Sequence, residues 1–356
     1  MLVGCGSDAP LACPDGSQPV GDSCAIGCPP TSFALPDGSC VAVGLGACPT
    51  GFLVTEAGCL PERASDCPPG TMALIGETSC RAVMTCGAGP WGDVEPGPTP
   101  QYVAAAFVGD SDGSAERPWT SIGAAVAAAS PGAVVVVGAG SYHESITVTG
   151  KAVDIRGVCP EAVHIVGAAQ TPPAVAVVDA EASGSRLSGV SITGPSAGFA
   201  TSGAVDVHLE RVWVHDTGNI GVDAEDPLGE TALVVSDSLI EGSAGSAAIF
   251  ASGASLVVER TVIRNTAAST RGIASQTSAS RRGDLQLRDA VLVGIGERGD
   301  AVVGWDAIID HTLVGGAGLG AINIKNDAAS GERSLVAITD AALINALHAG
   351  ISVFGA

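Results

Sequence analysis

Six side chains with the chemistry to bind a ligand occur in a repetitive region beyond residue 180. They follow the third apolar segment of successive repeats, in loops of variable length. Carboxylates, an indole and an amine on one face of a repeat protein are suited to binding a glycan or a cation. Ordinary solvated loop residues are the alternative interpretation of each of them. The six residues are Asp223, Asp226, Trp305, Asp306, Lys325 and Asp327.

A catalytic site in stacked repeats should appear as a column of matched residues about 4.8 Å apart. The most charged column instead alternates in sign, which is typical of a structural charge ladder on a surface. The six histidines fall at different positions of the repeat and predict no shared metal site. The sequence also lacks a phosphate-binding loop and a Gly-x-Ser-x-Gly motif, so we predict no catalytic residue, no metal and no cofactor. The alternating column comprises Gly189, Arg211, Asp237, Arg260, Asp289, His311 and Asp340.

One short phrase recurs at intervals of 22, 26, 23, 29, 22 and 29 residues. Five residues after its first aliphatic position, position zero, another aliphatic residue always follows. Two residues later comes Gly, Asp or Asn, the types that tolerate a left-handed backbone. The inward side-chain phase changes after position zero, which predicts a bend, and a third apolar segment follows, so each repeat is predicted to be one coil of a parallel β-solenoid. Position zero is occupied by Leu187, Leu209, Val235, Val258, Leu287, Ile309 and Ile338.

Residues 112–145 are expected to close one end of this solenoid. Either Thr120 or Ser121 can cap a short Ala-rich helix, and the valine run 134–137 follows the helix directly. The helix can therefore fold back as a lid over the apolar interior and the unpaired strand edge of the first coil. The residues that share its apolar face are Ile122, Val126 and Ala129.

The stretch DGS…RPWTSIGAAVAAA…GAVVVVGAGSYHESITV resembles the entry of pectate-lyase-like right-handed parallel β-helix proteins, many of them secreted or surface-anchored. The resemblance covers residues 102–356. It implies an all-β fold, a right-handed parallel β-helix with an N-terminal capping helix, preceded here by a small disulfide-rich segment. It implies no single activity, because this fold serves polysaccharide lyases, hydrolases and adhesins alike.

Enzymes of this family commonly build their cleft on the third strand, with clustered carboxylates. The aligned third segments of this chain present no carboxylate one residue after their centre. The fragments VWVHD (212–216) and IIDHT (308–312) faintly resemble the Trp-Ile-Asp-His stretch of pectate lyases but depart from it, so no family catalytic residue is carried over. The aligned third-segment residues are Gly221, Phe250, Ala274, Val303, Asn323 and Ser352.

Ten of the eleven cysteines lie within the first 86 residues, mostly in four blocks that begin with Cys-Pro and end with Cys. Such blocks are typical of small turns held by disulfides in an oxidising compartment. The simplest pairing closes each block on itself and leaves Cys86 for Cys159, with zinc binding as the alternative. The disulfide candidates are Cys13, Cys24, Cys28, Cys40, Cys48, Cys59, Cys67, Cys80, Cys86 and Cys159.

The tetrapeptide LVGC at residues 2–5 resembles the lipobox of bacterial lipoproteins, in which the cysteine is lipidated. We predict lipidation of Cys5, with an ordinary cysteine as the alternative. We also expect that both ends of the given chain are cut, since no leader precedes Cys5 and no cap follows the last strand. The predicted organisation is a lipobox remnant at 1–5, a Cys-rich segment at 6–86, a Pro/Gly-rich linker at 87–101 and the β-helix at 102–356.

The net charge of −21 and the presence of only two lysines argue against a nucleic-acid partner. No stretch of about 20 apolar residues predicts a transmembrane helix. The sequence therefore predicts an exported lipoprotein of the bacterial cell surface or outer membrane, attached to the membrane only by its lipid anchor. Its β-helix is predicted to be non-catalytic and to bind extracellular polysaccharide or another surface protein. The alternative is a polysaccharide lyase or glycoside hydrolase that acts on an acidic polysaccharide.

Overall fold

The computed structural model describes residues 17–20, 23–26, 32–34, 40–42, 48–55, 58–97, 99–278, 281–296, 300, 302–304, 306–325, 335–344 and 349–354. The chain forms two compact units, residues 1–60 and 61–356. Within the first unit, the described residues include short antiparallel pairs of strands. These pairs are β1 (Ser17–Val20) with β2 (Ser23–Ile26), β3 (Ser32–Ala34) with β4 (Cys40–Ala42), and β5 (Phe52–Thr55) with β6 (Gly58–Pro61).

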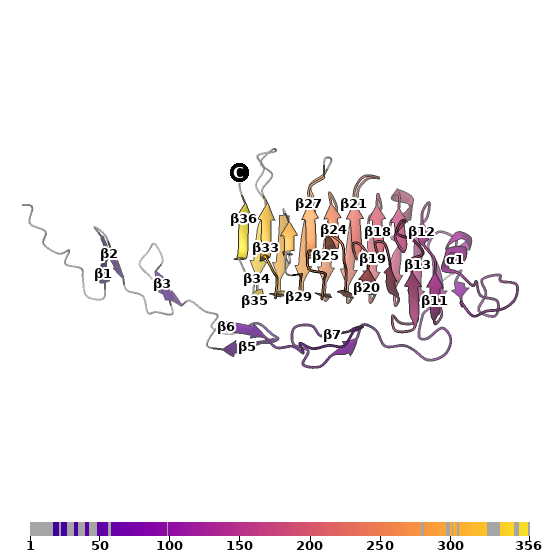
Figure 1. Cartoon of the computed structure of the whole chain (residues 1–356), viewed down its shortest axis with the longest axis horizontal. Coiled ribbons are helices and arrows are strands. Elements are labelled where there is room, and N and C mark those ends of the chain that lie inside the picture. Colours follow the sequence, from indigo (N-terminus) through magenta and orange to yellow (C-terminus); the bar gives the residue numbers. More distant parts are fainter. Residues whose placement is uncertain are drawn as a thin grey trace, which may run out of the picture. The chain divides into compact units, whose positions relative to one another are not determined.

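The second unit is a parallel β-solenoid in which each coil adds one strand to each of three sheets (Figure 1). The first sheet contains β9 (Gln101–Val103), β10 (Ala133–Val137), β13 (Val153–Gly157), β16 (Arg186–Ser188), β19 (Val207–Glu210), β22 (Ala232–Ser236), β25 (Ser255–Glu259), β28 (Asp284–Arg288), β31 (Asp306–Asp310) and β34 (Val336–Thr339). The second contains β11 (Gly140–His143), β14 (Val163–Val166), β17 (Ser191–Gly194), β20 (Trp213–Thr217), β23 (Leu239–Glu241), β26 (Val262–Arg264), β29 (Val291–Val293), β32 (Leu313–Gly315) and β35 (Ala342–Ile344). The third contains β12 (Ile146–Val148), β15 (Val175–Val178), β18 (Phe199–Ser202), β21 (Val222–Glu225), β24 (Ala247–Ser252), β27 (Arg271–Gln276), β30 (Val302–Gly304), β33 (Gly320–Lys325) and β36 (Ala349–Phe354). A 3₁₀ turn, Ala180–Ala182, lies between β15 and β16.

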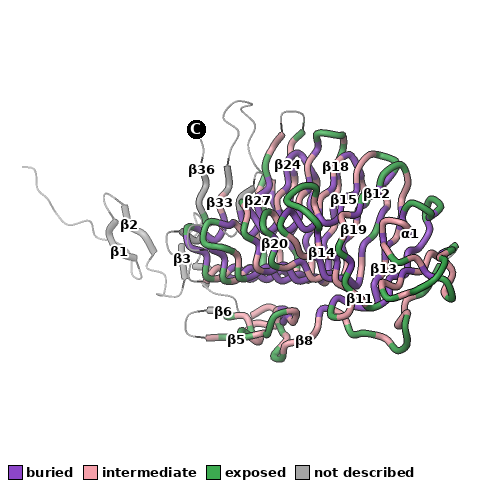
Figure 2. Tube along the Cα trace, turned by 45° about the vertical axis from the view of Figure 1, so that its right-hand side comes forward, coloured by how far each residue is buried: buried purple, intermediate pink, exposed green. Residues whose placement is uncertain are grey.

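The strand register confirms the repeat that the sequence predicts. Position zero of each repeat pairs with position zero of the next along the first sheet, and position five does the same along the second sheet. Both sets of side chains point into the solenoid, where they are buried in all coils but the last, whose Ile338 and Leu343 are half-buried (Figure 2). The predicted parallel β-helix is therefore the observed fold.

Left-handed residues make the corners between the first and second sheets. The predicted bend after position zero falls on one residue per coil with a positive φ, and that residue belongs to the alternating charge column. Neighbouring members pair across coils: the Arg260 guanidinium donates to both oxygens of Asp237 at 2.9 and 2.8 Å, and His311 bonds Asp289 at 2.6 Å. The column is thus a ladder that supports a strained corner, which costs about 1–2 kcal/mol per non-glycine residue. Its non-glycine members are Arg211, Asp237, Arg260, Asp289, His311 and Asp340.

A short helix, α1 (Ile122–Ala128), forms the predicted lid at the start of the solenoid. Ser121 is its N-cap and accepts a hydrogen bond from the backbone N–H of Ala124. The carboxylate of Glu144 accepts the next two helix N–H groups, those of Ile122 at 2.7 Å and Gly123 at 2.9 Å. The helix buries Ile122 and Val126 in the same core cluster as β9 and β10. The orientation of the helix satisfies two requirements. The N–H groups of its first turn need hydrogen-bond acceptors outside the helix, and its apolar face needs to pack against the core.

A strap made of residues 61–86 lies against the outer face of the second sheet. It contains a small antiparallel pair, β7 (Thr71–Met72) and β8 (Arg81–Ala82), closed by a disulfide between Cys67 and Cys80. A second disulfide joins Cys86 to Cys159 of the solenoid, and in the first unit Cys48 is bonded to Cys59. These are three of the five bonds of the simplest predicted pairing. The other candidates, Cys13, Cys24, Cys28 and Cys40, lie outside the part of the chain whose side chains the structure describes, as does Cys5 as a whole.

An ion pair buried beneath the strap fastens it to the solenoid. Glu241 of β23 and Arg264 of β26 form it at 2.7 Å, with side chains only 9% and 7% exposed. Glu241 also accepts the backbone N–H of Gly70 at 3.0 Å and the indole N–H of Trp213 at 2.9 Å. Arg264 donates to two strap carbonyls, those of Cys67 and Pro68, both at 2.9 Å. All of these polar groups are satisfied, which is the condition under which a buried ion pair is tolerated.

The strap changes how the predicted domains divide. Residues 61–100 belong to the same compact unit as the solenoid, so the latter part of the Cys-rich segment and the predicted linker are packed against the β-helix. The exact boundaries predicted at residues 86 and 101 stay predictions. Among the described residues, no helix is long and apolar enough to cross a membrane.

Candidate functional site

The outer face of the third sheet presents two columns of side chains, each formed by residues that pair with one another on successive strands. These two columns contain the carboxylates of the candidate site. In the first column, the register places Ala200, Asp223, Phe250 and Ala274 opposite one another on successive strands. In the second, two residues further along each strand, the sequence of side chains is Ser202, Glu225, Ser252 and Gln276. Inward residues such as Val222 and Ala224 alternate with them and are fully buried.

The register corrects one inference from the sequence. Counting along the repeats aligned Gly221 with Phe250 and left this column without a carboxylate, but Asp223 is the residue that pairs with Phe250. The error arises because the corner between the second and third strands differs in length from coil to coil. Asp223 therefore lies within strand β21 and not in the loop where the repeat pattern predicts it.

Asp223 sits in an apolar setting that disfavours its charged form. Its neighbours in the column are the methyl of Ala200 and the ring of Phe250, and its Oδ1 is buried with no hydrogen-bond partner among the described residues. Burial, and to a lesser extent the nearby charge of Glu225, raises the pKa of this carboxyl to about 7, against a smaller lowering by the Ala224 backbone N–H. Desolvation and a like charge are the two causes that keep a carboxylic acid protonated near neutral pH.

Glu225 provides the second carboxylate of the face. It lies two residues along the same strand, so its side chain leaves the sheet on the same side as that of Asp223, with about 6.6 Å between their Cα atoms. The Glu225 carboxylate has no hydrogen-bond or ion-pair partner within the described ranges. A protonated acid beside a second, unpaired carboxylate is the arrangement that general acid–base hydrolysis requires.

The pKa of Asp223 has a measurable consequence for stability. Between its ordinary value of 3.8 and about 7, the carboxyl ionises in the unfolded chain but stays protonated in the folded one. The protein should therefore lose stability as pH rises through this window. Replacing Asp223 with Asn removes this loss, so Asp223→Asn should gain roughly 2–4 kcal/mol relative to the wild type between pH 4 and pH 8. Urea unfolding of both proteins at the two pH values measures the gain, and an equal difference at both would contradict the raised pKa.

The other predicted ligand residues are placed differently. Asp226 is buried and its Oδ2 accepts a hydrogen bond from Ser278 at 2.6 Å, which joins the loops that follow β21 and β27. Asp306 is the first residue of β31, and Arg282 binds it at 2.7 Å. Lys325 ends β33, and its side chain is outside the described set, as are Trp305 and Asp327 entirely. A ligand role for these residues stays a prediction.

The structure joins only part of the predicted set into one site. It places Asp223 beside Glu225, a residue outside the predicted set. The alternation in VDAE (222–225) is the signal that could have found it, because a period of two puts both carboxylates on one face of a strand. Within the described residues, no group of three His, Cys, Asp or Glu side chains is close enough to hold a metal ion.

Comparisons with known proteins find relatives by structure only. No family model and no curated protein matches the sequence. Among solved structures, a pectin methylesterase from carrot matches with a TM-score of 0.50 and 13% identity, over 74% of this chain and 90% of that one. The catalytic domain of a GH87 α-1,3-glucanase in complex with nigerose matches with a TM-score of 0.49 and 17% identity, over 75% of this chain and 47% of that one.

A pectin methylesterase from the rice weevil matches with a TM-score of 0.45 and 13% identity, over 70% of this chain and 92% of that one. The chain spans about half the length of the glucanase chain that it matches. Identities this low carry the fold and nothing finer. The protein is, by fold, a right-handed parallel β-helix.

Proposed function

We propose that the outer face of the third sheet hydrolyses a polysaccharide, with Asp223 and Glu225 as its acid and base. The observation that carries the proposal is the buried, partnerless Oδ1 of Asp223 and its pKa of about 7, next to a second carboxylate on the same strand. Structural ion pairs also perturb pKa values, but among the described residues no cationic side chain forms an ion pair with Asp223 or Glu225. A structural neighbour that is a pectin methylesterase supports a polysaccharide as the substrate class.

The reaction that fits this geometry is inverting hydrolysis of a glycosidic bond. Protonated Asp223 donates its proton to the leaving glycosidic oxygen as the bond from that oxygen to the anomeric carbon breaks. A water molecule attacks the same carbon from the opposite face and gives its proton to Glu225. Inverting enzymes hold their two carboxyl groups about 6.5–9.5 Å apart to make room for this water. The Cα atoms of alternate residues on one strand lie about 6.6 Å apart, a spacing from which two side chains on the same face can hold their carboxyl groups at such a separation.

The substrate is proposed to be uncharged. The protein carries a net charge of −21, and the face presents two carboxylates with no compensating cation among the described residues. An acidic polysaccharide, the substrate of the sequence-based alternative, would be repelled by both. If no bond is cleaved, the sequence-based prediction of a non-catalytic surface protein that binds polysaccharide or another surface protein is favoured instead.

The disulfides support export of the protein, because such bonds persist in oxidising compartments. Attachment through a lipid on Cys5 at the cell surface or outer membrane remains our proposal. Mass spectrometry of the N-terminal peptide from a membrane fraction tests it.

Reducing-end release from neutral glucans and from polygalacturonate tests the proposed activity. Asp223→Asn and Glu225→Gln are each expected to lower kcat by roughly 10²–10⁴-fold, the contribution of a general acid or base. Wild-type activity should fall as pH rises above about 7, because Asp223 then loses the proton that it donates. Glu259→Gln, a matched change on β25 of the first sheet, should leave kcat within a factor of about two. Full activity in Asp223→Asn, or no cleavage of any neutral glucan, would overturn the proposal.

A further inference from the structure

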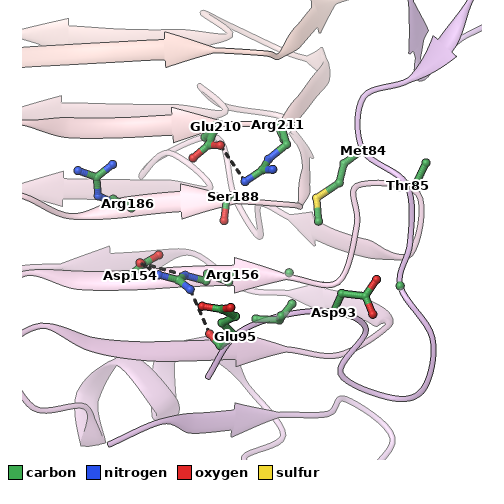
Figure 3. Close-up of a pocket in the computed structure, with 13 residues that line it drawn as sticks. Met84, Thr85, Asp93, Glu95, Asp154, Arg156, Arg186, Ser188, Glu210 and Arg211 are labelled. Carbon is green, nitrogen blue, oxygen red and sulfur yellow. Dashed lines mark hydrogen bonds and ion pairs between the residues drawn. The ribbon is translucent and has the colours of Figure 1, made fainter. Parts of the chain in front are cut away.

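A cavity of about 610 Å³ lies on the first sheet, on a different face from Asp223. One wall is formed by residues 84–95, and the opposite wall by the ends of β13, β16 and β19 (Figure 3). This volume is in the range of sites that hold small ligands. Its lining includes Met84, Arg156, Arg186, Ser188, Glu210 and Arg211.

Several contacts fix the wall that residues 84–95 form. The disulfide between Cys86 and Cys159 ties its start to the solenoid. Near its other end, the Arg156 guanidinium donates to the carbonyl of Glu95 at 3.0 Å. Between these points the backbone packs closely: a Cβ on Gly92 would lie 3.3 Å from the side chain of Val158. A cavity with fixed walls loses little entropy when it binds a ligand.

The cavity is lined by hydrogen-bond donors and acceptors side by side, and neither positive nor negative side chains predominate. Arg156 is paired with Asp154 at 2.6 Å, and Arg211 with Glu210 at 2.7 Å. Arg186 is exposed and has no hydrogen-bond or ion-pair partner among the residues that the structure describes. Ser188 lies between these groups, and the thioether of Met84 faces them from the opposite wall (Figure 3).

The charge balance decides which ligand chemistry fits. Three arginines face four carboxylates, those of Asp93, Glu95, Asp154 and Glu210, so the cavity has no surplus positive charge for an anion. A sugar hydroxyl both donates and accepts hydrogen bonds, and therefore suits a lining of paired guanidinium and carboxylate groups. The apolar side chains of Met84 and Val94 can cover the carbon face of a sugar ring.

We propose that this cavity binds a neutral saccharide. Such a site is separate from the third-sheet face and does not depend on catalysis there. Arg186 and Ser188 supply donors whose side chains have no hydrogen-bond partner in the described part of the chain, and the two ion pairs supply fixed acceptors. The site exists because residues 84–95, which follow the strap, pass over the first sheet.

Calorimetric titration of the whole chain tests this proposal. The probes are cellohexaose, maltohexaose, xylohexaose and nigerotetraose, with hexagalacturonate as the charged comparison. At least one neutral probe should bind the wild type with a Kd below about 1 mM. Ser188→Trp fills the cavity and should weaken that binding at least about tenfold, and Arg186→Ala should weaken it about three- to tenfold.

Two control variants separate this cavity from other surfaces. Gln286→Trp places the same indole on the outer face of the first sheet beyond the cavity, and should leave Kd within about twofold. Asp223→Asn should also leave it unchanged, which distinguishes the cavity from the proposed hydrolytic face. Thermal unfolding followed by circular dichroism checks that Ser188→Trp is folded, and Arg186→Ala, at an exposed position, provides a second test if it is not. The proposal is overturned if no neutral probe binds, if both cavity variants bind like the wild type, or if hexagalacturonate binds more tightly than every neutral probe.

Discussion

Arg264→Met should lower the free energy of unfolding of the solenoid unit by about 3–5 kcal/mol, the usual cost of breaking a buried ion pair on one side. Glu241, only 9% exposed, would keep its charge in a buried site without its 2.7 Å partner. Two strap carbonyls, those of Cys67 and Pro68, would lose their donors at the same time. Urea unfolding followed by circular dichroism measures the loss.

The double variant Glu241→Leu with Arg264→Met separates the charge from the packing. Replacing both members of a buried pair by apolar residues is often neutral, so the double variant should recover much of the lost stability. Arg117→Met is the exposed control: Arg117 pairs with Asp112 at 3.1 Å with both side chains about half exposed, and its loss should cost less than about 1 kcal/mol. Similar losses for Arg264→Met and Arg117→Met would show that the strap is not fastened by the buried pair.

Removal of the disulfide between Cys86 and Cys159 should have an effect of similar size. The bond closes a loop with a sequence separation of 73, and its loss in the Cys86→Ser, Cys159→Ser variant should cost about 4 kcal/mol through the added entropy of the unfolded chain. Urea unfolding with and without reductant measures this, since reduced wild type should resemble the variant. Saccharide binding should weaken in parallel, because the same bond anchors one wall of the cavity.

The Cys67–Cys80 bond provides the matched comparison for this effect. Its sequence separation is 13, for which the same model predicts about 3 kcal/mol, and it closes the strap on itself without reaching the solenoid. Its removal should therefore destabilise less and should leave saccharide affinity nearly unchanged. If the variant without the Cys86–Cys159 bond proves equally stable and binds saccharide equally well, the proposed anchoring is wrong.

Local patterns account for what could be predicted of the fold. The corner at Arg260 and the cap at Ser121 each depend on neighbouring residues, because a left-handed φ and a free helix N–H are properties of a few consecutive positions. The same holds for the inward columns, whose period of two is visible in each strand. The ion pair beneath the strap could be predicted in part. Glu241 and Arg264 both stand six residues after position zero, so the repeat places them next to each other on successive coils. Nothing local indicated that the strap would bury them.

The sequence by itself determined the coil, its corners and its lid, because each follows from short-range spacing and backbone preference. The Cys-Pro blocks predicted the Cys48–Cys59 and Cys67–Cys80 bonds in the same way, whereas Cys86–Cys159 was predicted only as the pair left over. Only the tertiary structure decided which residues meet across coils of unequal length, and this placed Asp223 beside Phe250 instead of Gly221. It also decided the burial that sets the pKa of Asp223, the clamp between Glu241 and Arg264, and the cavity beside Arg186. These features depend on the desolvation of groups far apart in the chain, which a one-dimensional pattern does not contain.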